Sequence, residues 1–222
     1  MHSILIESQF FPPIDYLARC AQTENVVIEA HEHFQKGSYR NRCHIAGANG
    51  LQILSVPLRR NNKNDEDIKG DFGGDFEDVR SIKNVKIAYD VDWQKQHWRT
   101  LQTAYGSAPF WNFYAPVFER FFNQQFDYLL DYNVEILTVI FKLLKIEKNV
   151  NISLSSTYEG VYTEGSDFRH KINPKINSAS NAVPYSQLFN DRYAFIPDLS
   201  VLDLLFCCGN QSLSILKNTT FQ

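Results

Sequence analysis

The sequence has no long apolar run. Nothing in its 222 residues approaches the roughly 18 consecutive apolar residues that a membrane-spanning helix needs. The opening stretch, MHSILIESQFFPP, also lacks the charged start and long apolar segment of a secretory signal. We therefore expect a cytoplasmic protein with no membrane insertion.

Charge of one sign is also scarce. The 22 Lys and Arg residues nearly balance 25 Asp and Glu residues, which gives a net charge of −3 and an isoelectric point near 6.1. Proteins that bind a nucleic-acid polymer need a basic face, which usually raises the isoelectric point. The composition therefore argues against a nucleic-acid polymer as partner.

Several sequence motifs are missing. The four cysteines, Cys20, Cys43, Cys207 and Cys208, lack the two-residue gap that lets two thiolates share a zinc ion, so we expect free thiols. No glycine-rich phosphate loop, G-x-S-x-G elbow or H-E-x-x-H helix is found. No cofactor is indicated by these patterns.

What the sequence does contain is ample material for a core, because 44% of its residues are hydrophobic and 14% aromatic. Residues 3–8 (SILIES) predict a strand, Pro12-Pro13 opens a helix through about residue 21, and residues 26–30 (VVIEA) predict a second strand. This order is a βαβ unit with parallel neighbouring strands.

The next segment predicts a hairpin. Residues 39–45 and 51–58 are β-prone and flank the turn residues Asn49-Gly50, and residues 85–89 predict a further strand. The fold class is therefore α/β, with a mixed sheet begun by the βαβ unit and extended by the antiparallel hairpin. A predominantly helical second half is expected to pack on it.

Apolar residues at helical spacing predict helices at about 93–105, 110–123 and 128–146. Residues 151–155 predict a last strand, and a Gly, Asn and Ser-rich passage at 159–181 has few core candidates.

We expect one domain over residues 1–222. Residues 1–92 form its mainly sheet part, with a mobile insert at 59–80 where hydrophobic periodicity is lost. Residues 93–150 form a helical part, and residues 151–222 form a loop-rich C-terminal part.

Histidines gather after the second predicted strand. If that strand stays extended, Glu29, His31 and His33 share one face and can bind a divalent metal or supply a general base. The alternative is a solvated polar surface. In the following strand, Arg40, Arg42 and His44 share a face, which with Lys36 suits a phosphate or carboxylate, unless the arginines only face water.

A fourth histidine lies in the first predicted long helix. Trp93, His97, Leu101 and Tyr105 recur every four residues and share one helix face. His97 is either a core histidine or a base in an aromatic pocket. Gln9 follows the first parallel strand, and open α/β sheets bind ligands beyond the carboxyl ends of such strands.

Four stretches, in order along nearly the whole chain, resemble one bacterial family: ESQFFPPIDYL, FQKGSYRNRCHI, DWQKQHWRTLQTAYGSAPFWNFY and YSQLF with FIPDLSVLDLLFCCG. This is the WbqC-like family, which is named from surface-polysaccharide (O-antigen) gene clusters. The sequence differs from the family pattern after the second strand, where Ala30, His31 and His33 replace an acidic pair and a Gln. By position, the resemblance implies roles for Gln9, Lys36, Asn41, Arg42, Trp93, His97, Tyr105, Pro109, Tyr114 and Asp203.

The function that this resemblance implies is acyl or aminoacyl transfer to a nucleotide-linked amino sugar, with His97 as the general base. The expected substrate-binding residues are Gln9, Lys36, Tyr39, Asn41, Arg42, Trp93 and Tyr105. Two alternatives remain open at this stage. One is a non-catalytic protein that binds a glycan or sugar nucleotide, and the other is a metal-dependent hydrolase using Glu29, His31 and His33.

Overall fold

The computed structural model describes residues 3–59, 81–176 and 180–221. The predicted insert lies outside these residues from position 60 onward. No helix in the described part of the chain is long and apolar enough to cross a membrane.

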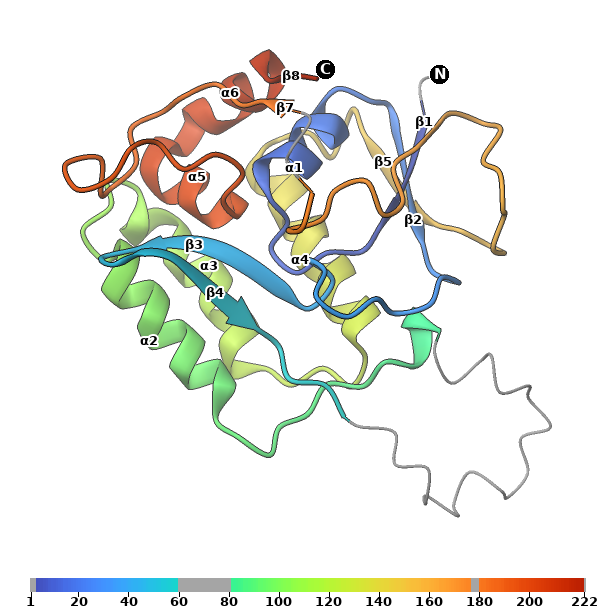
Figure 1. The fold of residues 1–222 in the computed structure, drawn as a ribbon, viewed down its shortest axis with the longest axis horizontal. Helices are drawn as coiled ribbons and strands as arrows, with labels where there is room; N and C mark the ends of the chain where they lie inside the picture. Colours follow the sequence, from blue (N-terminus) through green and yellow to red (C-terminus); the bar gives the residue numbers. More distant parts are fainter. Residues whose placement is uncertain (1–2, 60–80, 177–179, 222) are drawn as a thin grey trace.

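A four-stranded parallel sheet lies beside the first helix (Figure 1). Its strands are β1 (Ser3–Glu7), β2 (Asn25–Glu29), β5 (Asn151–Leu154) and β6 (Ser166–Asp167), in the order β5-β2-β1-β6. Helix α1 (Ile14–Ala21) connects β1 to β2. These two strands pair in parallel, from Ser3 with Asn25 to Glu7 with Glu29. The predicted βαβ unit is confirmed.

The predicted hairpin is also present, as β3 (Arg42–Gly47) and β4 (Gly50–Ser55). Among the described residues it forms a two-stranded sheet of its own, so it does not extend the parallel sheet as predicted. The strand predicted at 85–89 is wrong: these residues make only isolated bridges, after a short 3₁₀ turn, η3 (Ile82–Asn84).

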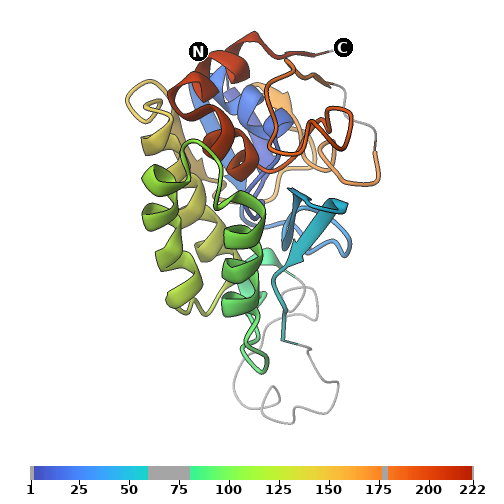
Figure 2. The same cartoon turned by 90° about the vertical axis from the view of Figure 1, so that its left-hand side faces the viewer.

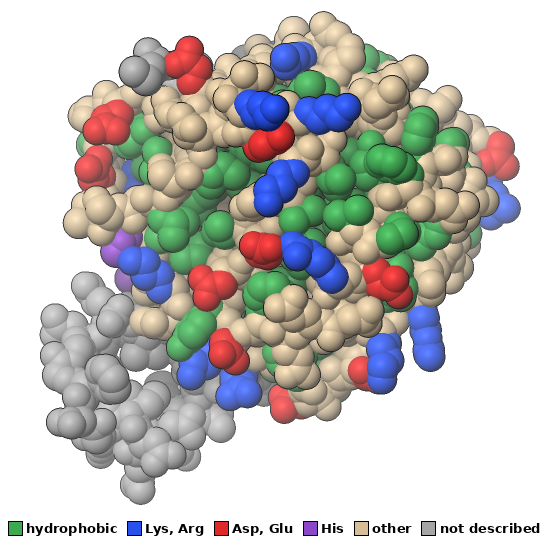
Figure 3. Space-filling model, turned by 180° about the vertical axis from the view of Figure 1, so that it is seen from behind, with side chains coloured by type: hydrophobic (Ala, Val, Ile, Leu, Met, Phe, Trp, Pro, Cys, Tyr) green, Lys and Arg blue, Asp and Glu red, His purple; other side chains and the backbone are tan. Residues whose placement is uncertain are grey.

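The three long helices form close to their predicted bounds, as α2 (Trp93–Tyr105), α3 (Trp111–Asn123) and α4 (Leu129–Leu143). Figure 2 shows α3 and α4 on one side of the molecule and the β3–β4 hairpin on the other. The opposite face from that of Figure 1 mixes hydrophobic patches with charged side chains of both signs (Figure 3).

The C-terminal part contains regular structure as well as loops. It carries α5 (Val201–Cys208), η4 (Gly209–Gln211), α6 (Ser212–Asn218) and a small pair of strands, β7 (Ser180–Asn181) and β8 (Thr220–Phe221). The strand at 151–155 is therefore not the last one.

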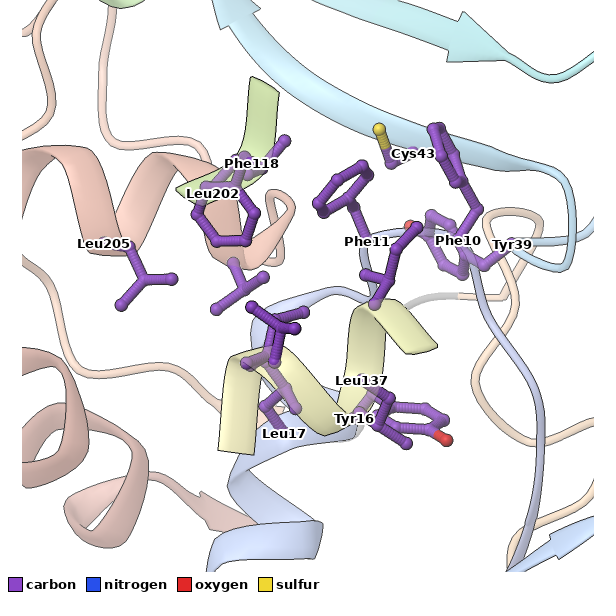
Figure 4. Close-up of a cluster of buried hydrophobic side chains, with 14 of the residues drawn as sticks. Phe10, Phe11, Tyr16, Leu17, Tyr39, Cys43, Phe118, Leu137, Leu202 and Leu205 are labelled. Atoms are coloured by element: carbon purple, nitrogen blue, oxygen red, sulfur yellow. The ribbon is translucent and has the colours of Figure 1, made fainter. Parts of the chain in front are cut away.

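The hydrophobic core fixes the loop that leaves β1. Phe10 and Phe11 are fully buried, and Figure 4 shows them among side chains from α1, the segment leading into β3, α3, α4 and α5. The Phe11 ring stacks on Phe122 with centroids 5.8 Å apart. Burying one such ring stabilises the fold by about 2 kcal/mol or more, so the chain beyond the carboxyl end of β1 is held firmly.

Close backbone approach holds β6 in place. A Cβ atom on Gly165 would lie 1.9 Å from the Ser3 carbonyl oxygen, so only glycine lets the chain enter β6 at this position. β6 then pairs with β1, with Leu5 opposite Asp167. This pairing brings the charged residues at 167–170 to the carboxyl end of the parallel sheet.

Candidate functional site

The carboxyl ends of three parallel strands each finish in an acidic residue. Glu7 ends β1, Glu29 ends β2 and Asp167 ends β6. Open α/β sheets bind ligands at this edge. We call the polar residues gathered there the carboxyl-end cluster: Glu7, Gln9, Glu29, Glu32, Arg40, Asp167, Arg169 and His170.

One ion pair of the cluster is fully buried. Arg40 donates from Nε to Glu32 Oε1 at 2.7 Å and from Nη2 to Glu32 Oε2 at 2.5 Å, and each side chain is 1% exposed. Burial raises the pKa of Glu32 to about 7, although the hydrogen bonds and charge of Arg40 act in the opposite direction. The prediction that Arg40 shares one strand face with Arg42 and His44 is therefore wrong. Strand β3 begins only at Arg42, and the Arg40 side chain is buried.

The second arginine joins two strand ends. Arg169 donates from Nη1 to Glu29 Oε2 at 3.0 Å and from Nη2 to Asp167 Oδ2 at 2.6 Å. Glu29 Oε1 also accepts from the Ser155 hydroxyl at 2.7 Å and from the His31 backbone N–H at 2.9 Å. Both oxygens of Glu29 are thus occupied by hydrogen-bond donors.

His170 lies where the cluster meets solvent, with its side chain 39% exposed. Its φ of 65° is in the left-handed region, and its backbone N–H donates to Glu7 Oε2 at 2.9 Å. Burial and the Arg40 charge lower the pKa of His170, so the ring is neutral at neutral pH. Because Arg40 Nη2 lies 3.1 Å from Nδ1 and can only donate, Nδ1 accepts and Nε2 carries the proton.

Negative charge exceeds positive charge in the cluster. Four carboxylates face two guanidinium groups, and Glu7 contacts neither guanidinium: its oxygens accept from Gln9 Nε2 at 2.9 Å and from the His170 N–H. Gln9 Oε1 has no hydrogen-bond partner among the described residues. A buried carboxylate surplus favours a cationic ligand or bound protons.

The three residues predicted to bind metal are not assembled as a site. β2 ends at Glu29, so the alternation that would align it with His31 and His33 stops there. Nε2 of His31 lies 2.8 Å from Lys83 Nζ. The backbone of His33 forms an isolated antiparallel β-bridge with Ser81. Within residues 3–59, 81–176 and 180–221, no group of three His, Cys, Asp or Glu residues is placed to hold a metal ion.

His97, the predicted base, lies in an aromatic pocket. Its ring is 5.1 Å from the Trp93 ring and 6.4 Å from the Phe10 ring, centroid to centroid. His97 is 9% exposed, and its Nδ1 has no partner among the residues described. Burial lowers the pKa of His97 to about 4, so the ring is neutral and weakly basic at neutral pH.

Trp93 and Tyr105 are core residues, 3% and 0% exposed. Trp93 Nε1 donates to the Ala88 carbonyl at 3.0 Å. The Tyr105 hydroxyl donates to Asp203 Oδ1 at 2.9 Å and accepts from the Ala46 N–H at 3.0 Å. Neither ring is open to stacking on a sugar.

The other predicted binding residues lie around the segment before β3. Lys36 is exposed, whereas Tyr39 is 7% exposed with its hydroxyl 3.5 Å from His44 Nδ1. Asn41 Nδ2 donates to the Val56 carbonyl at 2.9 Å. Nε of Arg42 is buried and has no partner in the described part of the chain.

Sequence reasoning missed most of the cluster, namely Glu7, Glu32, Arg40 as a buried residue, Asp167, Arg169 and His170. A usable signal was present in the two strands, because both SILIE and NVVIE close an apolar run with a glutamate. The DFRH stretch within the Gly and Ser-rich passage was a second signal.

The chain is similar to a known protein family and to one curated protein. The model of the WbqC-like protein family matches residues 7–71 and 73–178, a span that contains the whole carboxyl-end cluster. "Uncharacterized protein Rv1507c" of Mycobacterium tuberculosis is 24% identical over 244 residues and covers 96% of each chain. No solved structure matches.

Proposed function

The chain belongs to the WbqC-like protein family, and from this membership and the carboxyl-end cluster we propose that it is a transferase of surface-polysaccharide biosynthesis. It moves an acyl or aminoacyl group onto the amine of a nucleotide-linked amino sugar. The reaction takes place at the carboxyl-end cluster.

The observation that carries this proposal is the surplus of buried carboxylates at the ligand-binding edge of the sheet. Glu7, Glu29 and Glu32 are each 2% exposed or less, and two of them end neighbouring parallel strands. Glu29 and Glu32 have arginine partners, but Glu7 makes no ion pair among the described residues, and keeping such a carboxylate away from water is costly unless a cation or a proton joins it. An amine substrate brings both, because it arrives as an ammonium ion and must lose a proton to react.

We assign the proton-accepting role to Glu32 instead of His97. A base works best when its pKa lies near the operating pH, and the pKa of Glu32 is about 7 whereas that of His97 is about 4. The bound ammonium ion first releases one proton to solvent, which leaves a neutral amine. As the amine nitrogen attacks the acyl carbonyl and the carbon–nitrogen bond forms, a second proton passes from that nitrogen to the Glu32 carboxylate. The bond to the donor then breaks, and the departing group takes that proton.

His170 is placed to stabilise the negative charge that develops on the carbonyl oxygen. Its Nε2–H is the donor left available by the Arg40 contact at Nδ1, and the exposed ring can reach a ligand. Glu32 Oε2 lies 3.9 Å from His170 Nδ1, so the proposed acceptor and donor are neighbours.

Lysines beside the cluster suit the phosphates of a nucleotide. Gly37, next to the exposed Lys36, has a φ of +78°, and a Cβ there would lie 3.2 Å from Lys175 Nζ. Lys175, from a distant part of the sequence, therefore reaches the backbone next to Lys36, and two lysines in this region suit a phosphate ligand. Because nucleotide sugars are intracellular metabolites and all four cysteines are free, we place the protein in the cytoplasm.

Mass spectrometry of transfer products tests the proposal. The protein is incubated with UDP- and dTDP-linked amino sugars and with acyl-coenzyme A or aminoacyl-tRNA donors. We expect an N-acylated sugar nucleotide with at least one pair, at a rate that rises with pH through an apparent pKa near 7. Absence of product with every pair would reject the proposal.

A non-catalytic glycan-binding role receives less support. That alternative relied on Trp93 and Tyr105 for stacking, and both rings are buried in the core. The metal-dependent hydrolase required Glu29, His31 and His33 to act together, and Glu29 is instead occupied by Arg169 and Ser155.

A further inference from the structure

The Gln9 amide has a fixed orientation. Its Nε2 donates to Glu7 Oε1 at 2.9 Å and to the Ile172 carbonyl at 3.1 Å, and both of these partners only accept hydrogen bonds. Rotating the amide by 180° would place an oxygen against two oxygens, so Oε1 is the atom that remains. This oxygen is buried, and no donor reaches it within the described residues.

Glu7 has a complementary deficit. It is 1% exposed and accepts only from two neutral donors, the Gln9 amide and the His170 backbone N–H. Arg40 pairs with Glu32, and Arg169 pairs with Glu29 and Asp167. Glu7 is thus the carboxylate of the cluster that makes no ion pair in the part of the chain that the structure describes, although its charge also acts on Arg40 from a longer distance.

Tyr16 is a further buried group, and its hydroxyl has no hydrogen-bond partner among the described residues. Burial raises the pKa of Tyr16, and the negative charges of Glu7 and Glu32 act in the same direction. A cation bound by Glu7 would have a second acceptor in Gln9 Oε1, because the Gln9 amide contacts Glu7.

We infer that Glu7 and Gln9 form a subsite for a protonated primary amine. This inference rests on the proposed function, since it names the residues that receive the amine of the substrate. A primary ammonium group offers three N–H donors and one positive charge, whereas Glu7 makes no ion pair and Gln9 Oε1 accepts no hydrogen bond among the described residues. The ammonium group supplies both, which an N-acylated product cannot do, so product formation weakens binding.

The subsite can be tested without a transfer reaction, by using methylammonium chloride as the probe. Titration is followed by the NMR signals of the Gln9 side-chain amide and by the midpoint of thermal unfolding. We expect saturable changes in both with methylammonium. Tetramethylammonium, which has no N–H donor, and potassium at equal concentration are expected to leave them unchanged.

Variants locate the effect. Glu7→Gln is expected to weaken methylammonium binding at least tenfold, and Gln9→Met to weaken it less, whereas the exposed Glu24→Gln keeps it. If Glu7→Gln does not fold, the comparison of the three cations on the unchanged protein still decides. An equal response to all three cations, a response to potassium alone, or no response to methylammonium would overturn the subsite.

The two proposals fail separately. Methylammonium binding without any transfer product would keep the amine subsite and reject the transferase. Transfer activity that is unchanged by Glu7→Gln, with no methylammonium binding, would keep the transferase and reject the subsite.

Discussion

The surroundings of two histidines, His97 and His170, differ sharply in this molecule. His97 lies between the rings of Trp93 and Phe10, and burial alone lowers its pKa to about 4. His170 lies against Arg40 and Glu32 with its side chain 39% exposed, and both burial and a fixed charge lower its pKa. Both rings are neutral at neutral pH, yet only His170 has a neighbour that sets which nitrogen carries the proton.

The comparison shows how differently an aromatic pocket and a charged cluster act on a histidine ring. An apolar pocket makes the charged ring costly and offers nothing to hold a proton in transit. A cluster of carboxylates and guanidinium groups holds charges in fixed positions, which is what a reaction that moves a proton needs.

The largest effect is expected from breaking the cluster's buried ion pair. Arg40→Ala leaves the Glu32 carboxylate buried without its partner, and loss of one member of such a pair typically costs about 3–5 kcal/mol of stability. Urea unfolding at neutral pH measures the loss. The exposed pair of Arg120 with Glu135 supplies the control, because Arg120→Ala is expected to cost about 1 kcal/mol or less. Similar losses in both variants would contradict the account of the cluster.

The aromatic pocket predicts a pH-dependent stability. The pKa of His97 is about 4 in the folded protein and 6.5 in the unfolded chain, so the unfolded chain binds more protons between these values. This contribution is present above pH 6.5 and is lost as the pH falls through about 4. It amounts to about 3 kcal/mol at most. In urea unfolding at several pH values, His97→Leu should lack this part of the wild-type acid sensitivity, and an unchanged pH profile would contradict the placement of His97.

We expect Glu32 to make the free energy of unfolding depend on pH in the opposite direction. Its folded pKa of about 7 lies above the ordinary value of 4.5, so the folded protein binds more protons between these values. The contribution of Glu32 is present below pH 4.5 and is lost as the pH rises through about 7. The loss of stability caused by Glu32→Gln, measured by urea unfolding, should therefore be smallest near pH 7 and above. A stability difference that does not change with pH would indicate an ordinary pKa for Glu32.

The regular elements were predictable because their signals are local. The helical spacing in α2 and α4 and the Asn49-Gly50 turn each lie within a few residues of the element that they specify. The prediction of a strand at 85–89 was wrong because an apolar run becomes a strand only when it has a partner strand, and these residues form only isolated bridges.

The cluster was not predictable in the same way, because its contacts join distant positions. Glu29 pairs with Arg169, 140 residues away, and His170 meets Arg40 across 130 residues. Arg40 and Arg42 are two residues apart and look alike in the sequence. Arg42 begins strand β3, whereas Arg40 precedes the strand and forms a buried ion pair. Gln9 was predicted to bind a ligand from its place after β1, which follows from a rule about sheets and not from its side chain.

The central claim is that proton transfer takes place at the carboxyl-end cluster and not in the aromatic pocket. The most direct test is the single-turnover rate of acyl transfer in Glu32→Gln and in His97→Leu, each compared with wild type. Loss of a general base costs about 10²- to 10⁴-fold in rate, so we predict a loss of at least a hundredfold in Glu32→Gln and less than tenfold in His97→Leu. A hundredfold loss in His97→Leu with a near-normal rate in Glu32→Gln would contradict the account.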